Sequence, residues 1–191
     1  QNILKMSRLS EPVPEKFRER ISEEIYLVSA NNNTNNVKIR DGKLDIKTFV
    51  QEKEALEQWE PLTKAEFPLT AEFLGENLFA ALGVDIPDFD QEEYSLKALL
   101  KIAHMHPDLT AVRVKKQRFG YMVNNTICEH ANVLINGALV MSLSSESTEI
   151  DDIKKTIRDV GLVGIENINY LKAIKRVTGH DQGRLVNEVF E

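Results

Sequence analysis

Two glutamates and two basic residues between Val112 and Glu146 are spaced so that an antiparallel sheet would carry them on one face. They are Glu129, Glu146, Lys116 and Arg118. Carboxylate oxygens suit Mg²⁺ or Mn²⁺, while Lys and Arg side chains bind phosphate oxygens. These side chains could therefore hold a phosphorylated compound together with a divalent cation.

Two short turns would position these side chains. Asn124-Asn125 and Asn136-Gly137 predict two-residue hairpins joining three long strands, because Asn and Gly tolerate the positive φ that such turns need. The second turn predicts that Glu129 and Glu146 share a face, from these pairs: Ile135 with Ala138, Val133 with Val140, Ala131 with Ser142, Glu129 with Ser144, and Ile127 with Glu146. The first turn adds the basic residues to that face, from these pairs: Gly120 with Glu129, Arg118 with Ala131, and Lys116 with Val133.

A second hairpin is predicted within Val37–Val50, where Asp41-Gly42 lies between two alternating segments. Its register sets Arg40 opposite Lys43 and Lys38 opposite Asp45, with Lys47 further along the same face. The opposite face is apolar and carries Val37, Ile39, Leu44 and Ile46. A charged face is also typical of the solvated side of any half-buried sheet, and this alternative remains open.

The remaining pattern predicts helices grouped apart from the strands. A strand is expected at Glu24–Val28, a flexible polar connector at 31–36, and a helical insertion at about 71–107. Two further helices are expected after Ser147, the first stopped by Gly161 and the second by Gly179. Antiparallel hairpins with segregated helices indicate an α+β fold. The domain is expected to span 23–180, after a lead-in at 1–22 and before a tail at 181–191.

Composition narrows the function classes. The chain has 191 residues, a net charge of −6 and one cysteine, Cys128. The acidic balance argues against a general nucleic-acid surface or an anionic membrane surface, so phosphate binding would need a local basic cluster. No apolar run approaches a membrane span, and a single cysteine cannot form an intramolecular disulfide. A cytoplasmic location is the expectation, and the oligomeric state is not predicted.

The segment KIRDGKLDIKT, the later strand VKKQRFGY, the acidic strand after it and the final helix pair resemble the CYTH superfamily, or triphosphate tunnel metalloenzymes. The resemblance covers about 24–179. It implies an antiparallel barrel or tunnel that binds a triphosphate or polyphosphate with Mg²⁺ or Mn²⁺. It implies phosphate-binding roles for Lys38, Arg40, Lys47, Lys116 and Arg118. It implies metal-binding roles for Glu24, Glu129 and Glu146, with Glu57 and Glu66 as weaker candidates.

The first strand departs from the family pattern. The family has E-x-E-x-K, whereas Tyr26 and Val28 follow Glu24 here. A missing carboxylate leaves fewer oxygen ligands for a cation. The resemblance therefore implies a phosphate-binding protein and leaves open whether it is a metal-dependent triphosphatase. The alternatives are a non-catalytic phosphate- or nucleotide-binding module and a protein-interaction module.

Overall fold

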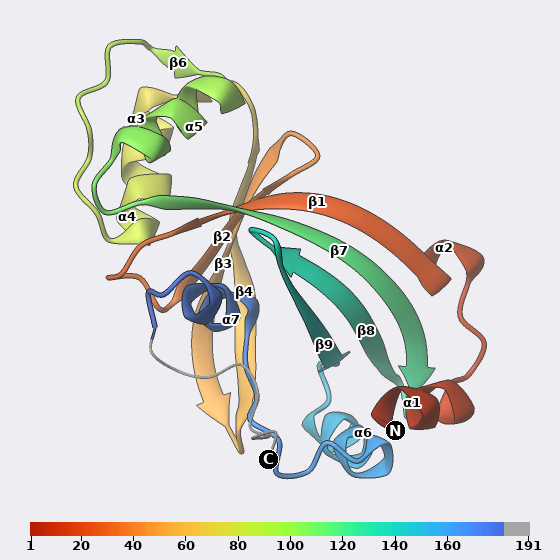
Figure 1. Cartoon of the computed structure of the whole chain (residues 1–191). Coiled ribbons are helices and arrows are strands. Elements are labelled where there is room, and N and C mark those ends of the chain that lie inside the picture. The colour runs from red at the N-terminus through yellow and green to blue at the C-terminus, as the bar shows by residue number, and fades with distance from the viewer. Residues whose placement is uncertain (182–191) are drawn as a thin grey trace. The chain divides into compact units, whose positions relative to one another are not determined.

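The computed structural model describes residues 1–181 and has an α+β architecture (Figure 1). Its main strands are hydrogen-bonded in the order β4-β3-β2-β1-β7-β8-β9, and β5 and β6 form a separate pair. The chain divides into two compact units. Unit 1 comprises Gln1–Glu23 and Lys115–Glu166, and unit 2 comprises Glu24–Val114 and, among the described residues, 167–181. The predicted α+β class is confirmed, and the closed tunnel stays a prediction.

Two long strands contribute residues to both units, β1 (Glu19–Val28) and β7 (Thr110–Val123). The other elements of unit 1 are α1 (Asn2–Leu9), α2 (Glu15–Arg18), β8 (Thr126–Ile135), β9 (Ala138–Glu146) and α6 (Ile150–Val160). The other elements of unit 2 are β2 (Asn35–Arg40), β3 (Lys43–Lys53), β4 (Leu56–Glu66), β5 (Leu69–Thr70), α3 (Ala71–Phe73), η1 (Leu74–Phe79), α4 (Ala80–Leu82), β6 (Glu93–Tyr94), α5 (Leu96–Met105) and α7 (Tyr170–Val177).

The three predicted two-residue turns are present. Both central residues of each turn have positive φ, between 44° and 95°. All five predicted β8–β9 pairs occur, including Glu129 with Ser144 and Ile127 with Glu146. In the β2–β3 hairpin, Arg40 pairs with Lys43 and Lys38 pairs with Asp45, as expected. Local turn chemistry thus determines which side chains share a face.

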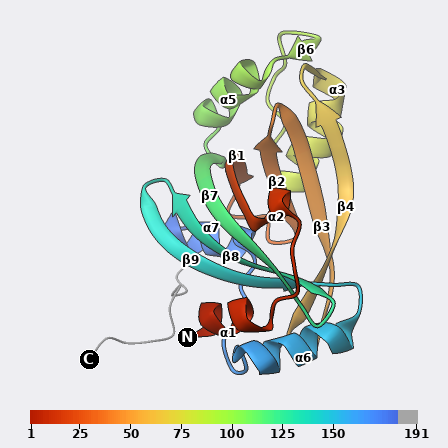
Figure 2. The ribbon, with the colours of Figure 1, turned by 90° about the vertical axis from the view of Figure 1, so that its right-hand side faces the viewer.

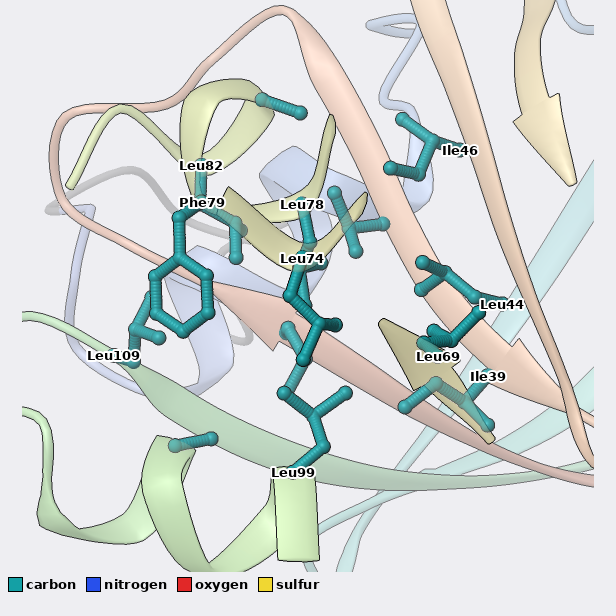
Figure 3. Packing of buried hydrophobic residues seen from close by; sticks show 14 of the residues in the cluster. Ile39, Leu44, Ile46, Leu69, Leu74, Leu78, Phe79, Leu82, Leu99 and Leu109 are labelled. Atoms are coloured by element: carbon teal, nitrogen blue, oxygen red, sulfur yellow. The ribbon is translucent and has the colours of Figure 1, made fainter. Parts of the chain in front are cut away.

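The core of unit 2 lies between its strands and the helices of the 71–107 insertion. The apolar side of the β2–β3 hairpin contributes Val37, Ile39, Leu44 and Ile46, and all four are buried. Figure 3 shows Leu74, Leu78 and Phe79 of the insertion pointing into the same cluster, with Leu99 from α5. Within the predicted helical insertion, Leu74–Phe79 is a π-helix between α3 and α4, and α4 ends at Gly83, which has a φ of 64°.

The core of unit 1 is smaller and joins the strands to two helices. Met6, Val123, Cys128 and Val160 form its buried cluster. Figures 1 and 2 both show α1 beside α6, and the Asn2 amide donates to the Val160 carbonyl at 3.0 Å. The segment predicted as a lead-in at 1–22 therefore contains two helices and the start of β1. Met6 supplies the buried side chain that orders α1.

The Asn-rich connector is held by a buried lysine of α7. Lys175 is 3% exposed, and its Nζ donates to the carbonyl oxygens of Ala30 and Asn32 and to Asn33 Oδ1, at 2.7–3.0 Å. The Asn32 side chain is also buried and accepts from the backbone N–H groups of Thr34 and Asn35. Polar residues predicted to be flexible therefore form a compact hydrogen-bonded turn.

The two C-terminal helices begin and end close to their predicted bounds. Asn169 caps α7, and Gly161 ends α6 with a φ of 83°. The N-cap residue of α6 is Glu149, whose side chain makes no capping bond. The described helices include none with the length and apolar character needed to span a membrane. The predicted tail lies outside the described residues, apart from Asp181.

Candidate functional site

Unit 1 contains a charged group that we call the Glu129 cluster: Arg20, Lys116, Arg118, Glu129 and Glu146. Arg20 Nη2 donates to Glu129 Oε2 at 2.7 Å, and Arg118 Nη2 donates to Ser22 Oγ at 2.9 Å. Lys116 is only 4% exposed, although lysine is rarely buried. Strands β1, β7, β8 and β9 thus each contribute a charged side chain to this cluster. The predicted hairpin registers placed Lys116, Arg118, Glu129 and Glu146 on one face, whereas Arg20 was not predicted.

The carboxyl group of Glu129 is placed among opposing influences. Burial raises its pKa above the ordinary value, and Glu146 adds to that increase by repulsion. The positive charges of Arg118, Arg20 and Lys116 act in the opposite direction but do not cancel the effect of burial. The cluster has three positive and two negative side chains when all are ionised. It is therefore a locally basic site in an acidic chain.

Two donors in the Glu129 cluster are buried without an acceptor. The Nε atoms of Arg20 and Arg118 have no hydrogen-bond partner among residues 1–181. A buried donor without an acceptor is costly, since it loses its bond to water. Oxygen atoms of a phosphate group are strong acceptors for guanidinium donors. The cluster is therefore chemically suited to an anionic oxygen ligand.

Unit 2 contains a second charged site, a hollow of about 300 Å³ that we call the Arg40 pocket. It is lined by Arg40, Asp41, Lys43, Asp45 and Lys64. Lys38 lies beside it and pairs with Asp45 at 3.5 Å, while Lys64 faces Asp45 across the β3–β4 pair. Lys47 lies further along β3, pairs with Asn36 and does not line the pocket. The lining of the Arg40 pocket has three cations and two carboxylates, so its net charge is positive when all are ionised.

Glu24 is buried in unit 2 and is held by its neighbours. Its side chain is 1% exposed. The Tyr26 hydroxyl donates to Oε2 at 2.9 Å, and Arg40 Nη1 donates to Oε1 at 3.4 Å. Tyr26 occupies the position where the family pattern has its second carboxylate. Both oxygens of Glu24 are therefore bonded to protein donors.

The two weaker acidic candidates have protein partners as well. Glu66 pairs with Lys43 at 2.5 Å, and this contact lowers the pKa of the Glu66 carboxyl group. Glu57 accepts from Trp59 Nε1 and from the Asn169 amide, all within 3.0 Å. Trp59 also packs edge-to-face on Phe49. Glu57, Trp59 and Phe49 line a separate hollow beside α7 in unit 2, and neither Glu57 nor Glu66 lines the Arg40 pocket.

Sequence reasoning missed Arg20 and Lys64. Arg20 fell inside the predicted lead-in, although the alternation Arg20, Ser22, Glu24 extends the expected strand toward the N-terminus. Lys64 lies in the extended segment predicted at 56–69, where Pro61 and Pro68 limit how far the segment can be a central strand. Its pairing with Asp45 requires the register of β3 against β4, which shifts at two places.

A divalent cation has few protein ligands in the described part of the chain. Residues 1–181 contain no group of three or more His, Cys, Asp or Glu side chains arranged to hold a metal. Glu129 and Glu146 offer carboxylate oxygens, but three cations surround Glu129. These residues suit Mg²⁺ or Mn²⁺ only together with phosphate oxygens, which would balance the cations and complete the ligand set.

No family model and no curated protein matches the chain. Two solved structures resemble it over most of its length, both from Pyrococcus. A conserved hypothetical protein from Pyrococcus furiosus shares 15% identity with a TM-score of 0.46, covering 89% of this chain and 91% of that one. The PH1012 protein from Pyrococcus horikoshii OT3 shares 16% identity with a TM-score of 0.41, covering 87% and 88%. At these TM-scores neither likeness defines the fold or the function of the chain.

Proposed function

We propose that this protein binds a small tri- or polyphosphate compound through its basic side chains. The observation that carries the proposal is the pair of buried Nε donors on Arg20 and Arg118, beside a buried Lys116, with no acceptor for either Nε in the described part of the chain. Phosphate oxygens would satisfy these donors with charge-assisted hydrogen bonds. The predicted CYTH-like tunnel is part of this proposal.

The Arg40 pocket supports the same ligand class independently. Lys38, Arg40, Lys43 and Lys64 gather around two aspartates, so an anion can replace those carboxylates as partner of the cations. Lys47, which lies on β3 with Lys43, would be an additional phosphate-binding residue. A ligand with several phosphate groups has more oxygen acceptors than a single carboxylate, so it can bind several basic side chains at once.

The protein either hydrolyses the bound compound or binds it without hydrolysis. Binding without hydrolysis is the second candidate function, and the hydrogen bonds of Glu24 favour it. Hydrolysis with Mg²⁺ or Mn²⁺ would use Glu129 and Glu146 as oxygen ligands, and the cation would stabilise charge on the phosphates. Glu24 would lose its hydrogen bonds from Tyr26 and Arg40 if it bound a cation. A cation in this protein would therefore depend on the ligand's own phosphates.

The test is calorimetric titration of the full chain with tripolyphosphate, with and without Mg²⁺. Arg118→Ala and Arg40→Ala should each weaken binding about tenfold or more, because a charged hydrogen bond contributes about 1.5–3 kcal/mol. Lys115→Ala is the matched control, because Lys115 neighbours Lys116 on β7 but is half exposed and pairs with Glu23 at 3.8 Å. Binding that survives both arginine substitutions would contradict the proposed function.

Hydrolysis is assayed separately as phosphate release in the presence of Mg²⁺ or Mn²⁺. Release that Glu146→Gln abolishes, with binding retained, would assign metal-dependent triphosphatase activity. Binding without release would identify a non-catalytic module. Absence of binding by tripolyphosphate, ATP and thiamine triphosphate alike would favour the interaction-module alternative.

A further inference from the structure

The two outer strands of the main sheet differ in how their edges are protected. Strand β4 lies at one end of the strand order and carries Pro61 and several charged residues. Strand β9 lies at the other end, and it has no charged residue and no proline from Ala138 to Ser145. Prolines and charges are the usual means by which proteins prevent edge strands from pairing with other chains. The β9 edge lacks both.

The backbone of β9 offers a regular row of hydrogen-bonding groups. In a two-residue hairpin the pair beside the turn exchanges both backbone hydrogen bonds, and hydrogen-bonded and non-hydrogen-bonded pairs then alternate. Ile135 and Ala138 form that first pair. The N–H and C=O groups of Leu139, Met141 and Leu143 therefore point away from β8. Among residues 1–181 no strand pairs with β9 on that side.

Leu139 and Met141 expose apolar side chains on one face of β9, and Leu143 on the same face is partly buried against the core of unit 1. Leu139 is 73% exposed and Met141 is 63% exposed, and Leu134 on β8, opposite Leu139, is 40% exposed. Of the fourteen large apolar side chains that are exposed among the described residues, unit 1 carries ten, namely Leu4, Leu9, Phe17, Ile21, Ile127, Leu134, Leu139, Met141, Val163 and Ile165. Exposed apolar side chains beside an open edge mark an interaction surface.

We propose that β9 pairs antiparallel with β9 of a second copy of this chain. A twofold axis at Met141 sets Met141 opposite its own counterpart and Leu139 opposite Leu143 of the second copy. All three residues then use their outward backbone groups, and apolar side chains face each other across the axis. A second copy fits because the stretch from Ala138 to Ser145 carries no charge, so two acidic chains meet there without like charges opposite one another.

Cysteine cross-linking tests this register. Hydrogen-bonded antiparallel partners have Cα atoms about 5.5 Å apart, which a disulfide can bridge. Met141→Cys should therefore give a covalent dimer under mild oxidation. In Leu139→Cys the two new cysteines would lie four residues apart along the strands, about 14 Å, and should not cross-link. Met105→Cys on α5 is the control, since Met105 is 73% exposed, and the native Cys128 is buried.

Sedimentation equilibrium of the full chain provides the second test. The wild type should show a concentration-dependent dimer, and Met141→Glu should remain a monomer because it places two carboxylates opposite each other. Circular dichroism should show that Met141→Glu is folded, and Met105→Glu should dimerise as the wild type does. A wild type that is monomeric throughout, or equal cross-linking of Leu139→Cys and Met141→Cys, would overturn the proposal and assign the edge to another polypeptide.

Discussion

Burial and neighbouring positive charges have opposite effects on the pKa of the Glu129 carboxyl group. Its raised pKa means that folding favours the protonated carboxyl group. The contribution of this group to stability is therefore fully present below its ordinary pKa of 4.5 and is lost as pH rises through the raised value. Glu129→Gln keeps the shape and cannot ionise.

We expect Glu129→Gln to gain stability relative to the wild type as pH increases from about 4 to 8. Urea denaturation at a series of pH values measures the difference in free energy of unfolding. Arg20→Ala should enlarge the pH dependence, because it removes a cation 2.7 Å from the carboxylate. A difference that shrinks with rising pH would show that the arginines outweigh burial.

Lys175 has a structural role that can be measured. Its Nζ satisfies three oxygen acceptors of the Ala30–Asn33 turn, and burial lowers its pKa. Lys175→Met should destabilise the protein by about 1–3 kcal/mol, because those buried acceptors lose their donor. Thermal unfolding measures the loss, with the exposed Lys155→Met as control. Equal melting temperatures for the two variants would contradict this role.

At the scale of elements, Gly120 allows α2 to pack against β7. A Cβ atom at position 120 would collide with the backbone carbonyl oxygen of Phe17 in α2. Gly42 is different, since its φ of 71° disfavours a side chain but a Cβ atom would meet no other atom within 4 Å. A side chain at position 120 would therefore clash with another element, whereas a side chain at position 42 would strain only the turn itself.

Gly42→Ala should cost about 1 kcal/mol of stability through its left-handed backbone. Gly120→Ala should cost clearly more, since the helix or the strand must shift to relieve the clash. Chemical denaturation of both variants compares the two free energies of unfolding. If Gly120→Ala were the milder change, α2 would have to move freely from β7.

At the scale of the whole molecule, the described chain has separate apolar clusters in its two units. Leu78 belongs to the cluster of unit 2, and Val160 belongs to that of unit 1. Leu78→Ala should cost about 2–5 kcal/mol, as is typical for a buried leucine, and Val160→Ala should cost less because it removes fewer atoms.

Hydrogen exchange should show where each change acts. Leu78→Ala should accelerate exchange mainly in β2, β3 and the 71–107 insertion, and Val160→Ala mainly in α1, α6 and β8. Mass spectrometry of peptides from the two units provides the comparison. Uniform acceleration across both units in either variant would show that they unfold as one cooperative body.

Much of the site could be predicted from the sequence because its strands are joined by two-residue turns. A positive-φ pair such as Asn136-Gly137 determines the register, and the period of two then determines that Glu129 and Glu146 share a face. These rules act over a few neighbouring residues. They need no knowledge of the rest of the fold.

Other features depended on tertiary structure because they join residues far apart in the chain. The contact of Arg20 with Glu129 requires the strand order β1-β7-β8, and that of Lys64 with Asp45 requires two register shifts. The burial of Lys175 depends on α7 reaching a turn more than a hundred residues earlier. The sequence by itself determined which charges share a hairpin face. Only the tertiary structure decided which charges from different hairpins and helices become partners, because that choice depends on long-range packing and burial.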